Sequence, residues 1–241
     1  MKAMILAAGR GERMRPLTDH TPKPLIKVAG KCLIDYHLEQ LSGLGIKDVV
    51  INHAWLGEQI PAHVGNGERY SLHAQFSDES QGALETAGGI IKALPMLGSE
   101  PFLVLNGDVF VAPHLSNLPQ LQEGKLAHLW LVENPEHNTA GDFSLSSGTI
   151  QNKKADSVAY TFSGIAIYHP EFFKSALVTS ESDNAINTAA DGKLPLGPML
   201  RQAADKGLVS GELLAAHWTD VGTPERLKQL EEQLVNHQLQ G

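Results

Sequence analysis

Residues 3–17 read AMILAAGRGERMRPL. The first four are apolar, as in a buried strand, and Gly9 and Gly11 follow where that strand would end. Glycines at a strand end allow backbone N–H groups to approach a ligand closely, and arginines bind phosphate oxygens through a fixed fork of donors. Lys23 follows between two prolines, which stiffen the chain around its charge. The stretch therefore predicts a polyphosphate site.

Two better-known phosphate motifs do not fit this stretch. The third glycine of the dinucleotide fingerprint is replaced by Met14, and no Gly-Lys-Ser/Thr follows to make a Walker loop. The loop therefore has to be interpreted from its own residues.

The composition places broad limits on the class of protein. The 241 residues suit one large α/β domain or two small ones, and 42% of them are hydrophobic. No apolar run approaches the roughly 20 residues that span a bilayer, and no secretory signal pattern is present. The only cysteine, Cys32, has no internal disulfide partner and is expected to be a small buried side chain at a helix start. We expect a cytoplasmic protein with no membrane partner.

The charge is unevenly distributed. The net charge is −8, yet residues 1–31 contain seven Lys and Arg against two acidic residues. An acidic chain argues against a general nucleic-acid binder. Positive charge concentrated beside a glycine loop indicates a local anionic ligand instead.

Apolar strands and amphipathic helices alternate in the first half of the chain, which is typical of βαβ units and a mostly parallel sheet. We expect strands at 3–6, 48–52, 72–76 and 102–105, and helices at 32–44, 58–64 and 85–94. In the second half we expect strands at 126–132, 159–168 and 213–217, and helices at 200–206 and from Thr223 onward. The polar segment 179–193 is expected to be an exposed loop.

Two carboxylates stand at the ends of expected strands. Asp108 follows the apolar run at 102–105, where open α/β sheets place their ligands, and Asp220 lies in a turn bounded by Gly222. A polyphosphate site needs Mg²⁺, which is typically held by one or two carboxylates together with substrate phosphates. We therefore expect Asp108 and Asp220 to be the metal ligands. Zinc is not expected, since the sequence has one cysteine and no HExxH motif.

Four motifs occur in a fixed order along the chain, at 6–17, 22–24, 106–108 and 220–223. Together they resemble the signature of the sugar-1-phosphate nucleotidyltransferases over essentially the whole chain. The resemblance implies a Rossmann-like α/β fold, with a mixed, mostly parallel sheet flanked by helices and no C-terminal β-helix. It also implies a single domain over 1–241, with a nucleotide-binding half at 1–110 and a sugar-phosphate-binding half at 111–241. The implied substrates are a nucleoside triphosphate and a sugar 1-phosphate, with Mg²⁺ as cofactor.

Further segments resemble the branch of this family that acts on N-acetylmuramate 1-phosphate in cell-wall recycling: 52–57, 84–86, 141–143, 161–165 and 217–223. That resemblance implies transfer of UMP from UTP, giving UDP-N-acetylmuramate and pyrophosphate. Alternatives are a mannose-1-phosphate guanylyltransferase or another hexose-1-phosphate nucleotidyltransferase. A non-catalytic nucleotide-sugar sensor on the same fold is a further alternative, although the five expected charged residues of the site are all present. Oligomeric state is left open.

The resemblance assigns roles residue by residue. The catalytic residues it implies are Arg15, Lys23, Asp108 and Asp220. The nucleotide-binding residues it implies are Leu6, Ala7, Ala8, Gly9, Gly11, Glu12, Arg13, Gly82, Leu84, Glu85, Thr86 and Asn106, with a helix cap as the alternative role for Glu85 and Thr86. The sugar-binding residues it implies are Gly141, Asp142, Thr161, Phe162, Ser163 and Gly164. A muramate carboxylate would need a further basic partner, for which Arg201, Lys153 and Lys154 are candidates.

Overall fold

The computed structural model describes residues 1–82, 84–112, 115, 117–178 and 192–238. Most of the polar segment expected to form an exposed loop lies outside the described residues. In the part of the chain that is described, no helix combines the length and apolar character needed to cross a membrane.

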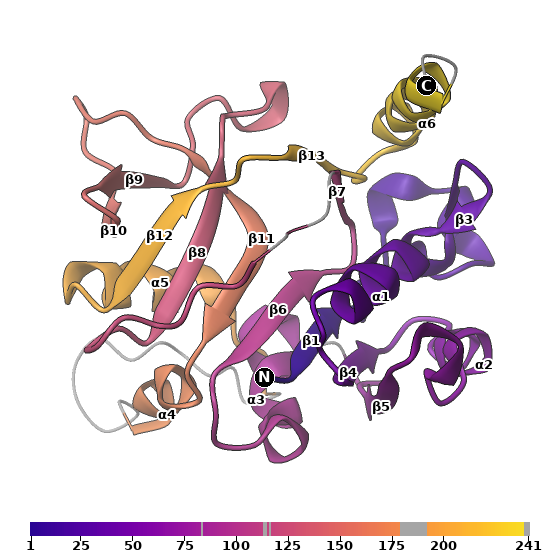
Figure 1. The fold of residues 1–241 in the computed structure, drawn as a ribbon, viewed down its shortest axis with the longest axis horizontal. Helices are drawn as coiled ribbons and strands as arrows, with labels where there is room; N and C mark the ends of the chain where they lie inside the picture. The colour runs from indigo at the N-terminus through magenta and orange to yellow at the C-terminus, as the bar shows by residue number, and fades with distance from the viewer. Residues whose placement is uncertain (83, 113–114, 116, 179–191, 239–241) are drawn as a thin grey trace. The chain divides into compact units, whose positions relative to one another are not determined.

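The main sheet is mixed and mostly parallel, as predicted, and its nine strands run in the order β5 (His73–Asp78), β4 (Asp48–His53), β1 (Ala3–Leu6), β6 (Phe102–Asn106), β11 (Thr161–Tyr168), β8 (Ala127–Val132), β12 (Val209–Leu213), β10 (Thr149–Asn152) and β9 (Phe143–Ser146). Strand β4 is parallel to β5, and β12 is parallel to β8. Strand β8 pairs antiparallel with β11, and β10 pairs antiparallel with both β12 and β9. Figure 1 shows β12, β8 and β11 side by side.

Six α-helices are present among the described residues: α1 (Leu33–Gly43), α2 (Gln59–Val64), α3 (Glu85–Leu97), α4 (Glu171–Val178), α5 (Leu196–Asp205) and α6 (Pro224–Gln238). Two further strand pairs lie outside the main sheet, β2 (Lys27–Val28) with β3 (Lys31–Cys32) and β7 (Val109–Ala112) with β13 (His217–Asp220). The predicted helices at 32–44, 58–64 and 85–94 are confirmed to within a few residues.

The strand predicted at 213–217 is wrong. Leu213 ends β12 and His217 begins β13, so the predicted segment is mostly the connection between two strands. Strand β12 was not predicted because it contains Gly211, and glycine weakens the apolar pattern of a strand. Its presence has a packing reason, since a Cβ at Gly211 would lie 2.7 Å from the Leu129 carbonyl oxygen and 2.5 Å from Ile150 Cδ1.

The chain forms two compact units, each built from separated segments. Unit 1 comprises residues 1–4, 84–104 and 119–215, and unit 2 comprises residues 5–83, 105–118 and 216–241.

Unit 1 has a core in which every residue of β8 is buried. Four aromatic side chains pack together in the same unit, with ring centroids 5.0–6.4 Å apart: Phe102, Tyr168, Phe172 and Phe173. Full burial raises the pKa of the Tyr168 phenol, so this residue stays neutral within the apolar cluster.

Unit 2 has an apolar cluster that draws on five elements far apart in sequence: Met14, Ile26, Val28, Leu33, Phe110, Val221, Leu227 and Leu230. Leu227 and Leu230 lie on one face of α6, with Leu234 packed against the same cluster, as the spacing of leucines predicts. Several members adjoin a polar residue of the predicted site, for example Met14 beside Arg15 and Val221 beside Asp220. Burial of the apolar neighbour therefore fixes where each polar side chain leaves the core.

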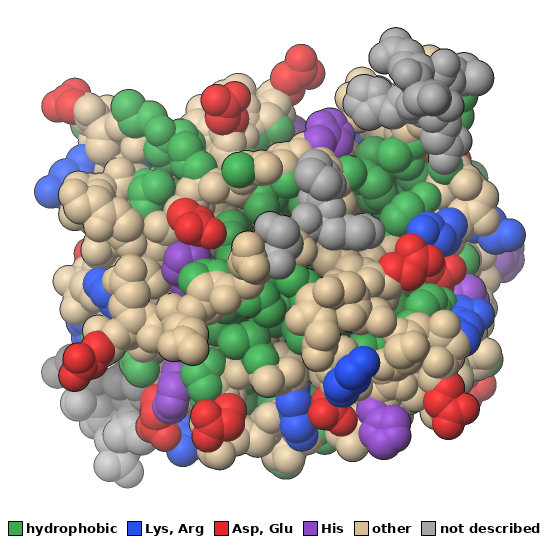
Figure 2. Space-filling view, viewed as in Figure 1, with side chains coloured by type: hydrophobic (Ala, Val, Ile, Leu, Met, Phe, Trp, Pro, Cys, Tyr) green, Lys and Arg blue, Asp and Glu red, His purple; other side chains and the backbone are tan. Residues whose placement is uncertain are grey.

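Acidic and basic side chains of the described residues are interspersed on the face shown in Figure 2. This face lacks, among the described residues, the continuous basic stripe that marks nucleic-acid-binding surfaces. Four of the basic residues in the N-terminal segment form ion pairs with acidic side chains: Arg10, Arg15, Lys23 and Lys31.

Candidate active site

The glycine loop of unit 2 is shaped by one position above all. Gly11 has φ +68°, in the left-handed region that glycine adopts without strain. A Cβ at this position would lie 3.0 Å from Thr18 Cγ2 and 3.3 Å from Lys23 Cβ. The Thr18 hydroxyl also donates to the Gly11 carbonyl oxygen at 2.9 Å. Gly11 is thus required both by the backbone and by close packing against the segment that carries Lys23.

The start of the loop is held by a buried polar chain. The Ala7 N–H donates to Asn52 Oδ1 at 2.7 Å, and Asn52 Nδ2 donates to Glu79 Oε1 at 2.7 Å. Asn52 and Glu79 are 3% and 2% exposed. On the other side, the Gly107 N–H donates to the Leu6 carbonyl oxygen at 2.9 Å, and a Cβ at Gly107 would lie 2.6 Å from that oxygen. The exit from β1 is therefore fixed from two directions.

Lys23 lies in the short 3₁₀-helix η3 (Lys23–Leu25), which starts after extended Pro22. The residue is 9% exposed, and its Nζ lies 2.6 Å from Asp108 Oδ2. The predicted phosphate-binding lysine and the predicted metal carboxylate, 85 residues apart, therefore form an ion pair in the structure.

The arginines of the loop are more exposed. Arg15 Nε donates to Asp19 Oδ1 at 2.7 Å, and Arg10 pairs with Glu12 at 2.5 Å while its guanidinium lies 3.9 Å above the Trp55 ring. The predicted leaving-group ligands Arg13 and Arg15 are both exposed on either side of buried Met14. Exposed side chains of this kind can reorient onto an anion at little cost.

Asp220 is brought next to Asp108 by the β7–β13 pair, which Figure 1 shows side by side. In this antiparallel pair Asp220 lies opposite Val109, and the Val221 N–H donates to the Asp108 carbonyl oxygen at 2.7 Å. The Asp220 carboxylate accepts hydrogen bonds from Arg226 at 2.6 and 2.5 Å. The backbones of Asp108, in the turn before β7, and Asp220, at the end of β13, therefore lie next to each other although the two residues are 112 positions apart in sequence.

The donor set of Asp108 and Asp220 fits a hard divalent cation, because carboxylate oxygens are the ligands such ions prefer. Each carboxylate now carries a cationic side chain, Lys23 or Arg226, in hydrogen-bonding distance. The pair of carboxylates is thus compensated in charge and held in place.

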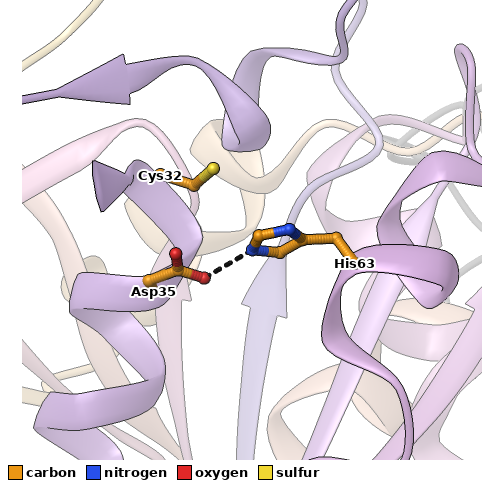
Figure 3. Close-up of side chains that lie close together, drawn as sticks. All are labelled: Cys32, Asp35 and His63. Carbon is orange, nitrogen blue, oxygen red and sulfur yellow. Dashed lines mark hydrogen bonds and ion pairs between the residues drawn. The ribbon is translucent and has the colours of Figure 1, made fainter. Parts of the chain in front are cut away.

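A second group of potential metal ligands lies elsewhere in unit 2, where atoms of Cys32, Asp35 and His63 come within 4.8 Å of one another (Figure 3). Asp35 Oδ1 lies 2.7 Å from His63 Nε2, and the Tyr70 hydroxyl donates to the same Asp35 oxygen. Arg69 Nη2 lies 2.9 Å from His63 Nε2 and 3.4 Å from Asp35. Burial raises the pKa of the Cys32 thiol, which disfavours the thiolate that metals require. We interpret this group as a polar network joining α1, α2 and the segment at 69–70.

Unit 1 contains a separate polar cluster built on the predicted sugar-binding residues. Asn138 Nδ2 donates to Asp142 Oδ1 at 3.2 Å and to Thr161 Oγ1 at 3.1 Å, and Thr161 donates to Asn134 Oδ1 at 3.0 Å. Asp142 Oδ2 accepts the Phe162 N–H at 2.9 Å. The structure thus brings together Asp142 and the 161–162 segment, as predicted.

The backbone beside this cluster has two special features. Gly141 has φ +62°, and a Cβ there would lie 2.8 Å from Asn134 Oδ1. Its carbonyl oxygen accepts from Lys153 Nζ at 2.7 Å. Between Phe162 and Ala166 the register of β11 shifts, which is a bulge of the kind that often re-aims side chains next to active sites.

The predicted base loop falls at a boundary between the units. Gly82 belongs to unit 2, and its N–H donates to the Glu79 carbonyl oxygen at 3.0 Å, whereas Leu84, Glu85 and Thr86 belong to unit 1. Helix α3 begins at Glu85, which has φ +60°, and no side chain caps this helix end. The helix-cap role considered for Glu85 and Thr86 is therefore not found. Asn106 ends β6, directly before Gly107.

Sequence reasoning assigned no role to Asn52, Glu79 or Arg226. Asn52 had a local signal, since it is a polar residue at the end of the apolar run Val49-Val50-Ile51. Arg226 could have been suspected from its place in the first turn of a helix that begins just after a candidate ligand. Glu79 lies in a polar loop and carried no such signal.

Comparison with known proteins supports a single family. The nucleotidyl transferase family model matches residues 2–237. The chain is 49% identical to an N-acetylmuramate alpha-1-phosphate uridylyltransferase of Neisseria meningitidis serogroup B, covering 95% of this chain and 96% of that protein. It is 33% identical to a protein of the same name from Caulobacter vibrioides, covering 92% of each.

The fold has a solved counterpart. A Bacillus anthracis structure assigned as a glucose-1-phosphate thymidylyltransferase matches 97% of this chain and 94% of its own, with a TM-score of 0.81 and 20% sequence identity. At that identity the match speaks for the fold, and it confirms the Rossmann-like architecture predicted from the motifs. With the match of the family model over nearly its whole length, the chain belongs to the nucleotidyl transferase family.

Proposed function

We propose that this protein transfers UMP from UTP to N-acetylmuramate α-1-phosphate, giving UDP-N-acetylmuramate and pyrophosphate. The observation that carries the proposal is the joining of Lys23, Asp108 and Asp220 beside the glycine loop. The near-full-length similarity to two uridylyltransferases of that name supports the choice of substrates.

The reaction needs no general base from the protein. A phosphate oxygen of the sugar 1-phosphate attacks the α-phosphorus of the triphosphate, the bond to the β-phosphate oxygen breaks, and pyrophosphate leaves with its electron pair. The second pKa of a phosphate monoester is about 6, so the nucleophile is largely dianionic at neutral pH. Catalysis therefore consists mainly of positioning and of neutralising negative charge.

In this mechanism unit 2 holds the triphosphate. Lys23 contacts the α-phosphate, and Arg13 and Arg15 contact the β- and γ-phosphates that leave. Backbone N–H groups of Gly9, Gly11 and Glu12 contribute further donors at the same place. The loop geometry supports this assignment because Gly11 packs directly against Lys23.

Asp108 and Asp220 would hold Mg²⁺, the divalent cation that best suits one or two carboxylates plus phosphate oxygens. When bound, the ion supplies Lewis-acid stabilisation of charge on the reacting phosphates. Lys23 can then turn from Asp108 toward the α-phosphate, since both partners compete for the same ammonium group.

The uracil is proposed to lie against the backbone of Leu6, Ala7 and Ala8, with Asn106 as a further contact. Gly82, Leu84, Glu85 and Thr86 are also proposed to bind the nucleotide. Asn52 accepts the Ala7 N–H and so holds the backbone of this segment in place. Base choice would then depend on backbone groups whose positions are set by Asn52 and Gly107.

The sugar is proposed to bind through Gly141, Asp142 and the segment at 161–164 in unit 1. Of the candidate partners for the muramate carboxylate, Lys153 already donates to two carbonyl oxygens, those of Ala140 and Gly141. Arg201 on α5 is exposed, and its guanidinium lies close over Gly197. We therefore favour Arg201, and an unchanged KM for the muramate substrate in Arg201→Ala would exclude it.

The experiment that tests the function measures pyrophosphate release with Mg²⁺ across UTP, GTP, dTTP and CTP, each against muramate, N-acetylglucosamine, glucose and mannose 1-phosphates. A clear maximum for UTP with N-acetylmuramate 1-phosphate is expected. A maximum for GTP with mannose 1-phosphate would overturn the substrates while retaining the mechanism. Nucleotide binding without turnover in any combination would favour a sensor over an enzyme.

A further inference from the structure

Arg226 reaches from the first turn of α6 back to the end of β13. Thr223 precedes the helix, and its hydroxyl oxygen accepts the Arg226 N–H at 3.4 Å while its carbonyl oxygen accepts the Leu227 N–H at 3.0 Å. Side chains of a helix lean toward its N-terminus, which directs Arg226 toward Asp220. The side chains of Arg226 and Asp220 are 15% and 18% exposed, so this ion pair is largely shielded from solvent.

Gly222 makes this contact possible. A Cβ at Gly222 would lie 2.1 Å from Arg226 Nη2, 2.9 Å from its Cζ and 3.2 Å from Asp220 Oδ2. The φ of Gly222 is outside the left-handed region, so the turn itself does not require glycine. The guanidinium lies directly against the backbone at this position, so a side chain here would displace it from its present place.

A single nitrogen of Arg226 serves both carboxylate oxygens. Nη1 lies 2.6 Å from Asp220 Oδ1 and 2.5 Å from Oδ2, which places a positive group between the two oxygens. A cation that approached the carboxylate along the same line would meet this group. Charge repulsion and occupied lone pairs both oppose it.

We propose that Arg226 is a positioning residue that holds Asp220 before substrate binds and competes with a divalent cation for its carboxylate. The inference rests on the metal-binding role proposed for Asp220. Because Lys23 compensates Asp108 in the same way, neither carboxylate presents uncompensated charge to a lone ion. The metal therefore binds mainly together with the triphosphate, whose oxygens add ligands for it and offer Arg226 another anionic partner.

The test measures binding of Mn²⁺ alone to the nucleotide-free protein, by the loss of the free-ion electron paramagnetic resonance signal. Arg226→Gln is expected to bind Mn²⁺ about tenfold more tightly than the parent, since a unit charge a few ångströms from the site is removed. Arg226→Lys keeps the charge without the planar guanidinium and is expected to lie much nearer to the parent.

Two further variants keep the test decisive. Gly222→Ala leaves the charge in place and displaces only the guanidinium, so it is expected to shift Mn²⁺ affinity in the same direction by less. Asp220→Asn combined with Arg226→Gln is expected to abolish the gain. Circular dichroism and thermal unfolding establish that each variant is folded.

The outcomes separate this inference from the proposed function. If Asp220→Asn weakens Mn²⁺ binding but Arg226→Gln leaves it unchanged or weaker, the competing role of Arg226 is wrong and the metal site stands. If the double variant Asp220→Asn, Arg226→Gln binds Mn²⁺ as tightly as Arg226→Gln alone, Asp220 is not a ligand, and both its proposed role and this inference fail.

Discussion

The polar cluster of unit 2 consists of charged side chains, whereas the polar cluster of unit 1 consists mainly of neutral ones. In unit 2 the predicted site consists of full charges paired across the sequence, Lys23 with Asp108 and Asp220 with Arg226. In unit 1 the predicted sugar-binding cluster consists mainly of amides and a hydroxyl, joined to the one carboxylate of Asp142. That carboxylate accepts a backbone N–H and an amide donor, with no Lys or Arg on it in the described contacts.

This difference matches two kinds of ligand. Phosphate groups carry charge, which changes during the reaction and must be compensated by groups that can exchange partners. A sugar ring offers neutral hydroxyl and amide groups, for which a rigid array of neutral donors and acceptors is sufficient. Substitutions of the paired charges in unit 2 should therefore affect turnover, whereas those in the neutral cluster of unit 1 should affect the binding of one substrate.

The largest effect is expected for Asp108→Asn. Loss of a charge partner of the transition state costs several kcal/mol, so turnover should fall by about 1,000-fold or more at saturating Mg²⁺. Steady-state pyrophosphate release measures it. Turnover within about threefold of the parent would mean that Asp108 is not a metal ligand, and the contrast between a charged site in unit 2 and a neutral one in unit 1 would lose its main support.

Asp142→Ala is expected to act on the sugar phosphate alone. The substitution leaves the Phe162 N–H without its acceptor. An unpaired group of this kind costs about 1–3 kcal/mol, which here would weaken the binding free energy of the sugar phosphate by up to that amount. The KM for the sugar phosphate should rise by about 5- to 100-fold with kcat and the KM for UTP little changed. A matched rise in the KM for UTP would mean that the two clusters do not divide the substrates as proposed.

Asn52→Ala tests whether the nucleotide site depends on a neutral buried group as well as on charge. The variant removes the side chain that bonds both the Ala7 N–H and Glu79. We expect this loss to lower the free energy of unfolding by about 1–3 kcal/mol. We expect a higher KM for UTP and an unchanged KM for the sugar phosphate. Asn52→Asp, of nearly equal size, is the matched control, since it keeps an acceptor for Ala7 but repels Glu79.

The same contrast explains what sequence could and could not predict. Local patterns were sufficient for five of the six helices described, with α4 (Glu171–Val178) not predicted, and for the glycine loop, because apolar periodicity and glycines are local features of the sequence. Pairing across long distances was not accessible in this way. The antiparallel pair β7–β13, which joins Asp108 to Asp220, consists of two four-residue strands with no apolar alternation to reveal their register.

Arg226 shows the limit most clearly. In the sequence it is an ordinary charged residue in a polar first turn, typical of a solvated helix face. Its role follows only from contact with Gly222 and Asp220, and the meaning of Gly222 changes with it. A glycine that sequence reasoning treats as part of a turn in fact lies against the guanidinium and leaves room for it.

The smallest expected effect concerns protonation in unit 1, away from both clusters. His128 is buried on β8, with Nδ1 3.0 Å from Ser210 Oγ, and its ring packs edge-on to Trp130. Burial lowers the pKa of His128, and the attraction of Glu212 only partly opposes this shift. As the pH falls, His128 therefore takes up a proton more readily in the unfolded chain than in the folded protein.

The sign of the pH dependence follows from that shift. The contribution of neutral His128 to stability is complete above the unfolded pKa of about 6.5 and is lost as the pH falls below it, with a slope of at most about 1.4 kcal/mol per pH unit. Urea unfolding at pH 7.5 and pH 5.5 should thus show a smaller loss of stability for His128→Asn than for the parent. Equal losses in the two proteins would mean that His128 keeps an ordinary pKa, because the other histidines contribute alike to both.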